Sequence, residues 1–293
     1  MKIGFVGLGK LGLPVALAVE SKGHKVYGFD IKKEIYEQIK NRKIGYKEKH
    51  ANDLLKKTKI EIVELKKLIK LSDIIFVPIQ TPHDKKYEGI NDIPKTRKDF
   101  DYKYLVNGIK MISTELKKIK KKKIVIIIST VLPGTIRKKV LPVTNKYTQI
   151  GYNPFFIAMG TTIDDFLYSE IILFGSENKF VSQKAKDFYR TLTSSPFFET
   201  TIENAELIKV VYNTFISTKI AYINSITELC QRLPNTNIDE VTRALSLSNK
   251  RIISSAYLKG GMGDGGGCHP RDNIAMSYLA KRHNISFYIF EAI

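Results

Sequence analysis

Residues 2–12 read Lys2-Ile3-Gly4-Phe5-Val6-Gly7-Leu8-Gly9-Lys10-Leu11-Gly12. The first five are typical of a short buried strand, and the rest has the G-x-G-x-x-G spacing of a turn that leads into a helix. A helical run from Leu13 to Ser21 follows, and then a second strand-like run, Lys25–Phe29, ends in Asp30. Asp30 stands 18 residues after Gly12. Strand, glycine turn, helix, strand and acid in this order predict a Rossmann-type dinucleotide-binding unit.

The glycine turn and Asp30 together favour NAD as the cofactor. Glycines let a pyrophosphate come close to the backbone and to the positive end of the helix. The expected contact residues in the turn are Gly7, Gly9, Lys10, Leu11 and Gly12. Asp30 would accept hydrogen bonds from the adenosine ribose, and its charge would repel the 2′-phosphate of NADP. Lys32 and Lys33 weaken this preference without reversing it, and Lys33 is also a candidate cofactor contact. The alternative is a glycine-rich turn in an unrelated α/β unit.

Helices and strands continue to alternate beyond this unit. Helical spacing recurs near residues 33–40, 63–70 and 102–118, and runs rich in Ile and Val lie at 74–77 and 124–128. The alternation predicts a doubly wound parallel sheet, covered on both faces by helices. Ligands of such sheets bind at the carboxyl ends of the strands, where Thr81 and Thr130 follow the two later strands. We expect both threonines at the nicotinamide edge of the site, although threonines that merely begin a loop would have the same spacing.

A long uninterrupted run joins two parts of the chain. Residues 203–232 contain no Gly or Pro, and they would span about 45 Å as one helix. Thr200 or Thr201 can cap this helix. Four residues recur with helical spacing and are expected to face a core: Leu207, Val211, Thr214 and Thr218. Lys209 and Asn213 lie one turn apart on another face and can point at one ligand.

The expected fold class is therefore α/β: a Rossmann-type doubly wound sheet, followed by a long central helix and a small all-α domain. We expect a dinucleotide-binding domain at residues 1–200 and a central helical domain, which carries a cysteine site, at residues 201–293.

A second glycine-rich stretch occupies residues 260–267, with six glycines in eight residues. It leads into Cys268, Pro270 and Arg271, and then into a run with helical spacing. Pro suits the first turn of a helix, so Cys268 is predicted at or just before a helix N-terminus. A helix N-terminus and a nearby arginine both lower the pKa of a thiol, which makes Cys268 a candidate nucleophile. The alternative is a flexible glycine linker beside a structural thiol.

The bulk composition is that of a soluble globular protein with a basic surface. The chain has 293 residues, 43% of them hydrophobic, and no apolar run approaches the length of a membrane span. Its two cysteines, Cys230 and Cys268, fit a reducing compartment, so a cytoplasmic location is expected. The net charge of +19 comes mostly from dispersed lysines, with one dense run at residues 117–123. We expect a solvated basic surface that attracts anionic substrates; a nucleic-acid partner is the disfavoured alternative.

Taken together, these motifs resemble the UDP-glucose/GDP-mannose dehydrogenase family, whose members oxidise a nucleotide sugar at C6 to the uronate. The resemblance extends over essentially the whole chain, in the family's order. The matching segments are Gly7–Gly12 with Asp30, Thr81-Pro82, Ser129-Thr130-Val131-x-Pro133-Gly134-Thr135, Asn153-Pro154, Ala205-Glu206-Leu207-Ile208-Lys209 with Asn213, and Gly266-Gly267-Cys268-x-Pro270-x-Asp272.

The resemblance implies roles for individual residues. Members of the family use two NAD in turn, and a cysteine attacks the intermediate aldehyde to give a thiohemiacetal and then a thioester. Cys268 would be this nucleophile. Lys209 and Asn213 would stabilise the oxyanion, and Asp272 with Thr130 would hold the water that accepts a proton. Arg271 replaces the family's lysine at the cofactor phosphate.

The resemblance also implies a substrate site and an assembly. The expected substrate contacts are Lys209, Asn213, Tyr257, Gly261 and Gly265. The helix at 203–232 would form a homodimer interface.

Three departures from the family pattern bear on activity. Phe155 stands where the family has a glutamate associated with the activation of water for thioester hydrolysis. His269 replaces an aromatic or aliphatic neighbour of the cysteine. Family members also carry a second nucleotide-binding domain, which holds most contacts to the UDP or GDP base, whereas this sequence ends at Ile293.

Several interpretations remain open on these grounds. The sequence is a fragment, or it is a short form completed by a partner chain. Two other classes are a non-catalytic NAD-binding protein and a β-hydroxyacid or 6-phosphogluconate-type dehydrogenase, which needs no cysteine.

Overall fold

The computed structural model describes residues 1–82, 84, 86, 96, 98–258, 268–287 and 289–293. The chain divides into two compact units, Met1–Val211 and Tyr212–Ile293. The first contains the sheet, and the regular elements described in the second are all helices, joined by turns and irregular segments.

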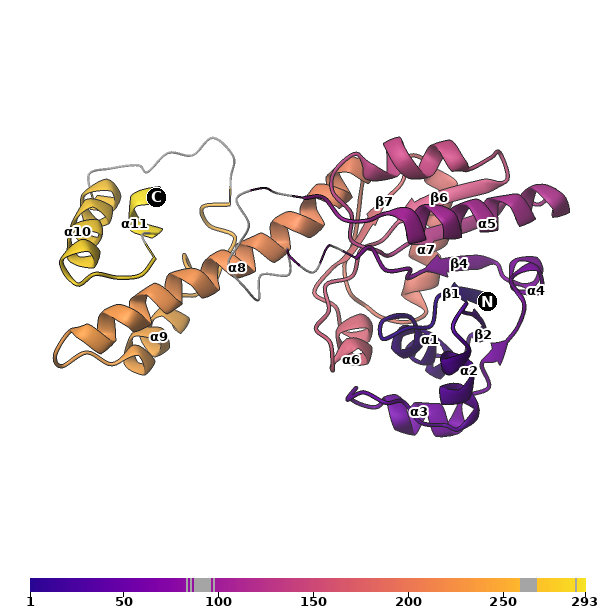
Figure 1. Cartoon of the computed structure of the whole chain (residues 1–293), viewed down its shortest axis with the longest axis horizontal. Helices are drawn as coiled ribbons and strands as arrows, with labels where there is room; N and C mark the ends of the chain where they lie inside the picture. Colours follow the sequence, from indigo (N-terminus) through magenta and orange to yellow (C-terminus); the bar gives the residue numbers. More distant parts are fainter. Residues whose placement is uncertain (83, 85, 87–95, 97, 259–267, 288) are drawn as a thin grey trace. The chain divides into compact units, whose positions relative to one another are not determined.

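The first unit is built on one eight-stranded sheet with the order β3-β2-β1-β4-β5-β6-β7-β8 (Figure 1). Its strands are β1 (Lys2–Val6), β2 (Lys25–Phe29), β3 (Glu61–Ile62), β4 (Ile74–Val77), β5 (Lys123–Ile127), β6 (Thr148–Tyr152), β7 (Ile172–Gly175) and β8 (Phe197–Thr200). All pairs from β3 to β6 are parallel, as predicted. β7 departs from this parallel arrangement: it runs antiparallel to β6 and carries β8 parallel to itself. Apolar runs predict strands but not their direction.

Helices cover both faces of this sheet. They are α1 (Gly12–Ser21), α2 (Lys33–Lys40), α3 (Ala51–Lys57), α4 (Leu65–Leu71), α5 (Lys103–Ile119), α6 (Thr162–Leu167) and α7 (Lys179–Arg190), with a short π-helix, η2 (Ile136–Val140), and a short 3₁₀ helix, η3 (Leu141–Val143). Alternate residues of a strand enter different cores: Ile74 and Phe76 pack with α1 and α7, whereas Ile75 and Val77 pack with α4 and α5. The two cores confirm the doubly wound architecture.

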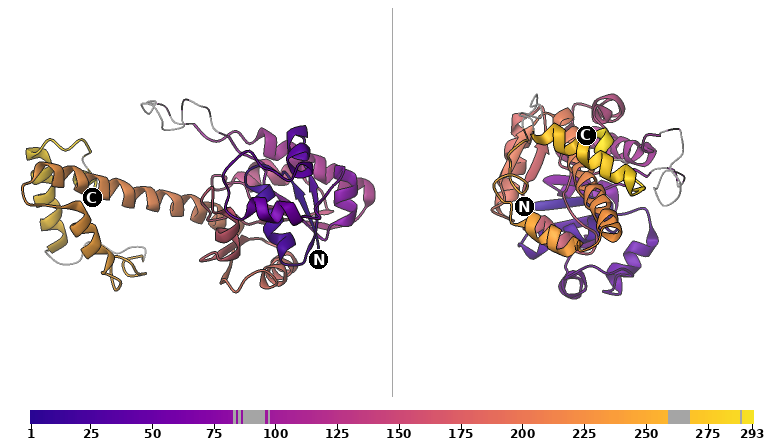
Figure 2. Two further views of the ribbon diagram at one scale, coloured as in Figure 1. Left: turned by 90° about the horizontal axis from the view of Figure 1, so that it is seen from below. Right: turned by 90° about the vertical axis from the view of Figure 1, so that its left-hand side faces the viewer.

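The predicted long helix is α8 (Ile202–Arg232), which begins in the first unit (Figure 2). Thr201 caps it, because its hydroxyl accepts a hydrogen bond from the amide of Asn204 at 3.2 Å. The face of α8 that is buried in the first unit comprises Ile202, Ala205, Glu206 and Lys209. These positions follow the i, i+3, i+4, i+7 spacing of one helix face.

The expected core-facing repeat of α8 is wrong. Leu207 and Val211 are 48% and 52% exposed, and Thr214 and Thr218 are also exposed. They lie on a different face from Glu206 and Lys209. Helical spacing identified a stripe of residues, but the side of α8 that packs in the first unit is the one that carries Ala205, which is fully buried.

The second unit has a small core of its own. Besides the end of α8 it contains α9 (Ile238–Ser246), α10 (Cys268–Arg282) and α11 (Ile289–Ala292). Leu229, Ala280, Ile285, Ile289 and Phe290 form its buried cluster. Cys268 is the first residue of α10, as predicted from Pro270. Within the described ranges, no helix combines the length and the apolar character that a membrane crossing requires.

Candidate functional site

The glycine turn between β1 and α1 has the shape that a phosphate group needs. Gly7 has φ +113°, a conformation that favours glycine. A Cβ on Gly12 would lie 2.2 Å from the carbonyl oxygen of Gly7, so only glycine fits there. A Cβ on Gly9, in contrast, would meet nothing within 4 Å. The backbone at Gly9 is therefore open to a ligand at the N-terminus of α1, which is the position expected for the cofactor pyrophosphate.

Asp30 lies directly against this turn. One of its carboxylate oxygens accepts a hydrogen bond from the amide of Leu8 at 2.7 Å, and the other accepts from the amide of Lys32 at 2.8 Å. The side chain is half-buried. Each oxygen keeps further acceptor capacity, so the carboxylate can still receive ribose hydroxyls. The structure thus brings the acid and the glycine turn together as the sequence predicted.

The other residues predicted at this end of the site lie around the turn. Lys10 is exposed, with its ammonium 5.9 Å from the ring centroid of Tyr46, and Leu11 packs against the core. Lys33 begins α2 and is exposed.

Thr81 and Thr130 are in direct contact. The hydroxyl of Thr81 donates a hydrogen bond to the carbonyl oxygen of Thr130 at 2.7 Å. Ser129 donates to the carbonyl oxygen of Ile79, so the segments that follow β4 and β5 are tied together twice. Both threonines are half-buried at the carboxyl edge of the sheet, the same edge as the glycine turn.

Glu206 is a buried carboxylate whose role the sequence did not reveal. Its side chain is 0% exposed, and it accepts hydrogen bonds from the amide of Ile136 at 2.8 Å and from the amide of Gly134. Burial raises the pKa of the Glu206 carboxyl above its ordinary value, and the two backbone donors oppose this shift. The available signal was its position: Glu206 shares a helix face with Ala205 and Lys209, where a lone charge needs a partner.

Lys209 follows one turn later on the same buried face. It is 7% exposed, and its ammonium lies 5.0 Å from the ring centroid of Phe156. Burial lowers the pKa of Lys209. Asn213, the residue expected to act with it, is exposed and belongs to the second unit.

Phe155 takes part in the apolar core. Its ring centroid is 5.2 Å from that of Phe166, and it packs against the cluster on the α1 face of the sheet. A cavity of about 20 Å³ beside it is lined by Asn153, Tyr189 and nine further residues. This volume is about that of one water molecule.

The remaining candidates lie in the second unit. Cys268 is placed by its backbone only, at the start of α10. Arg271 forms an exposed ion pair with Asp272, with Nη2 3.0 Å from Oδ1. Tyr257 is 57% exposed, and its ring centroid is 6.4 Å from that of His269. The predicted contacts Gly261 and Gly265 fall outside the described residues. Among the side chains that the structure does describe, no group of three or more His, Cys, Asp and Glu could hold a metal ion.

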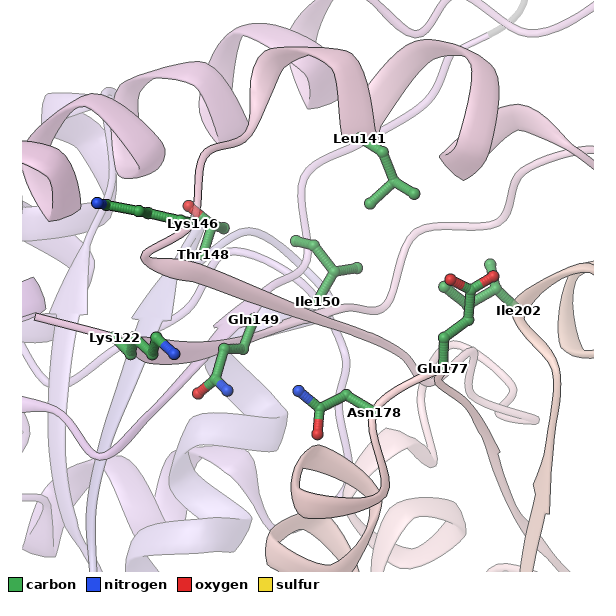
Figure 3. A pocket seen from close by; sticks show the side chains of 9 residues that line it. All are labelled: Lys122, Leu141, Lys146, Thr148, Gln149, Ile150, Glu177, Asn178 and Ile202. Carbon is green, nitrogen blue, oxygen red and sulfur yellow. The ribbon is translucent and has the colours of Figure 1, made fainter.

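A cavity of about 280 Å³ lies elsewhere on the first unit (Figure 3). Lys122 precedes β5 and Thr148 begins β6, so this cavity sits at the amino edge of the parallel strands, opposite to the glycine turn. None of the predicted site residues lines it. The candidate site is therefore the carboxyl edge, with Gly9, Asp30, Thr81 and Thr130.

Comparison with known proteins gives one consistent result. The model of the UDP-glucose/GDP-mannose dehydrogenase family, NAD binding domain, matches residues 1–193, and that of the family's central domain matches residues 203–293. The chain is 30% identical over 307 residues to the UDP-glucose 6-dehydrogenase of Rickettsia prowazekii, and 26% identical over 300 residues to the GDP-mannose 6-dehydrogenase of Pseudomonas aeruginosa. These alignments cover 100% and 97% of this chain, but only 66% and 65% of those relatives.

The fold gives the same match. The crystal structure of a ternary complex of GDP-mannose dehydrogenase from Pseudomonas aeruginosa superposes with a TM-score of 0.90 at 25% identity. The superposition covers all of this chain and 67% of that one.

Proposed function

Because the chain belongs to the UDP-glucose/GDP-mannose dehydrogenase family, we propose that it oxidises a nucleotide sugar such as UDP-glucose at C6 to the uronic acid with NAD. The observation that carries the proposal is the carboxyl edge of the sheet. There the open backbone at Gly9, the Asp30 carboxylate and the contact between Thr81 and Thr130 would take the pyrophosphate, the ribose and the nicotinamide of a dinucleotide. The chain spans less than two thirds of the curated relatives named above, so the complete reaction is part of the proposal.

In the proposed reaction Gly9 and Asp30 would help to hold NAD, which would supply the hydride acceptor for each of two oxidations of the substrate carbon. After the first oxidation the Cys268 thiolate attacks the aldehyde carbon, a C–S bond forms, and the carbonyl oxygen takes up a proton. Loss of the second hydride and of the hydroxyl proton leaves a thioester. Water then attacks the thioester carbon and the C–S bond breaks; one proton of the water goes to the Cys268 thiolate, and the other is released together with the carboxylate product.

Chemical properties of the other candidates support the roles proposed for them. Lys209 is buried beside Phe156, and a cation in a site of low polarity stabilises a developing oxyanion strongly. Asn213 would share this role. Asp272 and Thr130 would hold the water. The Arg271–Asp272 ion pair is exposed, and such pairs contribute little free energy, so Arg271 remains available to a cofactor phosphate.

We also propose a homodimer through α8. The helix exposes a series of large apolar side chains: Leu207, Val211, Phe215, Ile216 and Ile220. A second copy of the chain would remove this surface from water. Cys230 carries a free thiol, which is consistent with a proposed reducing, cytoplasmic location.

The test is reduction of NAD by the purified chain with UDP-glucose, followed by absorbance, in the unmutated protein and in Cys268→Ala. We expect a lasting loss of turnover in Cys268→Ala with NAD binding retained. The matched control is Cys230→Ala, which removes the free thiol of α8 and should keep activity. Full turnover by Cys268→Ala would contradict a cysteine mechanism and favour a β-hydroxyacid or 6-phosphogluconate-type dehydrogenase.

A further inference from the structure

The loop that joins β5 to η2, residues 128–135, is held by hydrogen bonds from three other parts of the first unit. Thr81, after β4, donates to the carbonyl oxygen of Thr130. The hydroxyl of Tyr102, at the start of α5, accepts from the amide of Leu132 at 3.3 Å. Glu206, on α8, accepts from the amides of Gly134 and Ile136. The loop therefore has a defined conformation before any cofactor contacts it.

Glu206 makes the strongest of these attachments. Ile136 is the first residue of η2, and the first amides of a helix have no partner within the helix. The buried carboxylate supplies that partner with both of its oxygens, and hydrogen bonds to a charged group are stronger than those between neutral groups. The carboxylate in turn needs these two donors, because it is shielded from water. The pair of bonds joins α8 to a loop that lies 70 residues away in the sequence.

We propose that Glu206 is a positioning residue for the nicotinamide half of the cofactor site. Through Gly134 and Ile136 it holds the loop so that Thr130 stays in contact with Thr81 at the carboxyl edge of the sheet. This inference rests on the proposed function, because it takes these two threonines as the neighbours of the nicotinamide.

The arrangement of the sheet implies that Glu206 influences only one half of the proposed cofactor site. The adenosine half of the site is formed by the glycine turn and Asp30, which are tied to each other through Leu8 and not to Glu206. The order of strands places β2, which ends beside Asp30, two positions away from β4 and three from β5. Loss of the Glu206 attachments should therefore disturb one half of the cofactor site and leave the other half intact.

The experiment compares two ligands by calorimetry on the full chain: NADH, and ADP-ribose, which lacks the nicotinamide. Glu206→Gln keeps the shape of the side chain but replaces one acceptor oxygen by a donor, so one buried amide loses its partner. We expect the affinity for NADH to fall by about tenfold or more. The affinity for ADP-ribose should stay unchanged. Glu203→Gln is the matched control, because Glu203 lies on the same helix and bonds to the side chain of Arg137 but to no loop amide.

Glu206→Asp keeps the charge and should restore part of the NADH affinity; it also serves as the test variant if Glu206→Gln does not fold. An equal loss of affinity for NADH and for ADP-ribose would indicate a general structural role for Glu206 and would overturn the proposal. An unchanged affinity for NADH would overturn it as well. If the unmutated chain bound ADP-ribose as tightly as NADH, and Thr130→Ala changed neither affinity, the nicotinamide site itself would be wrong. That outcome is measured without any Glu206 variant. A failure of the proposed nicotinamide site can therefore be told apart from a failure of the role proposed for Glu206.

Discussion

Two carboxylates organise the proposed cofactor site at the scale of single residues. Asp30 accepts a hydrogen bond from the amide of Leu8 in the glycine turn. Glu206 accepts hydrogen bonds from the amides of Gly134, in the loop after β5, and of Ile136, the first residue of η2. Both use backbone amides that would otherwise lack a partner, and both thereby shape a surface of the site. They differ in exposure, since Asp30 is half-buried and Glu206 is fully buried. Asp30 is thus available to a ligand, whereas Glu206 acts through the backbone that it holds.

The position of Asp30 predicts a preference for NAD over NADP. Asp30→Ala should narrow the difference in binding free energy between the two cofactors by a few kcal/mol at most, the scale of charge-assisted hydrogen bonds. Calorimetry with each cofactor measures this difference. Asp53→Ala, in which an exposed carboxylate of α3 is lost, is the control and should leave the preference unchanged. Equal affinity of the unmutated chain for NAD and NADP would refute the assignment of Asp30.

Phe155 predicts slow release of the covalent intermediate. A phenyl ring packed on Phe166 cannot activate water, so the thioester on Cys268 should persist. With UDP-glucose and NAD we expect a burst of NADH followed by slow turnover, and mass spectrometry of the quenched protein should detect the adduct on Cys268. Phe155→Glu should shorten the lifetime of the adduct. It should also lower the stability of the protein, because it removes a ring pair worth about 1 kcal/mol and places a carboxylate against the apolar core.

Phe155→Gln separates the two effects of that substitution. It removes the ring but provides no carboxylate, so the adduct should stay long-lived. The C6 aldehyde of the nucleotide sugar, supplied directly with NAD, tests the cysteine step alone. Absence of any adduct on Cys268 under those conditions, in a folded protein shown to bind NAD, would mean that the chain does not carry out this step.

At the scale of elements, α8 has two chemically different faces. The buried face carries Glu206 and Lys209, and the exposed face carries Leu207, Val211 and Phe215. One helix thus supplies the candidate site groups of the first unit and an apolar surface that a partner can cover.

The exposed face predicts a homodimer that a single charge can break. Phe215→Glu should shift the chain to a monomer, because burying an unpaired carboxylate in an apolar interface is costly. Light scattering at tens of micromolar reports the mass directly. Lys57→Glu makes a larger charge change at an exposed position of α3, outside α8, and serves as the control. A monomer in the unmutated protein at that concentration would contradict the proposed assembly.

At the scale of the whole molecule, the sequence predicted local structure better than it predicted contacts between distant parts of the chain. The strand, glycine turn, helix and second strand at residues 2–29 were predicted correctly. Thr201 is one of the two caps that the sequence offered for α8, and Cys268 lies at the start of α10, within the predicted range. Each depends on neighbours within a few residues, through backbone conformation, periodicity or the unpaired amides of a helix end. The contact of Thr81 with Thr130 was also predictable, because parallel strands bring their carboxyl ends to one edge.

Only the tertiary structure decided which surfaces meet. Three features show this: β7 runs in the reversed direction, Leu207 and Val211 are exposed, and Glu206 accepts hydrogen bonds from the amides of Gly134 and Ile136. Each depends on contacts between residues that are distant in sequence. A periodic pattern gives a helix its faces but does not say which face packs on the sheet. A lone glutamate in a sequence likewise does not show that it is buried. Those outcomes depend on the packing of the complete first unit, in which Ala205 faces the sheet and each buried polar group has to find a partner.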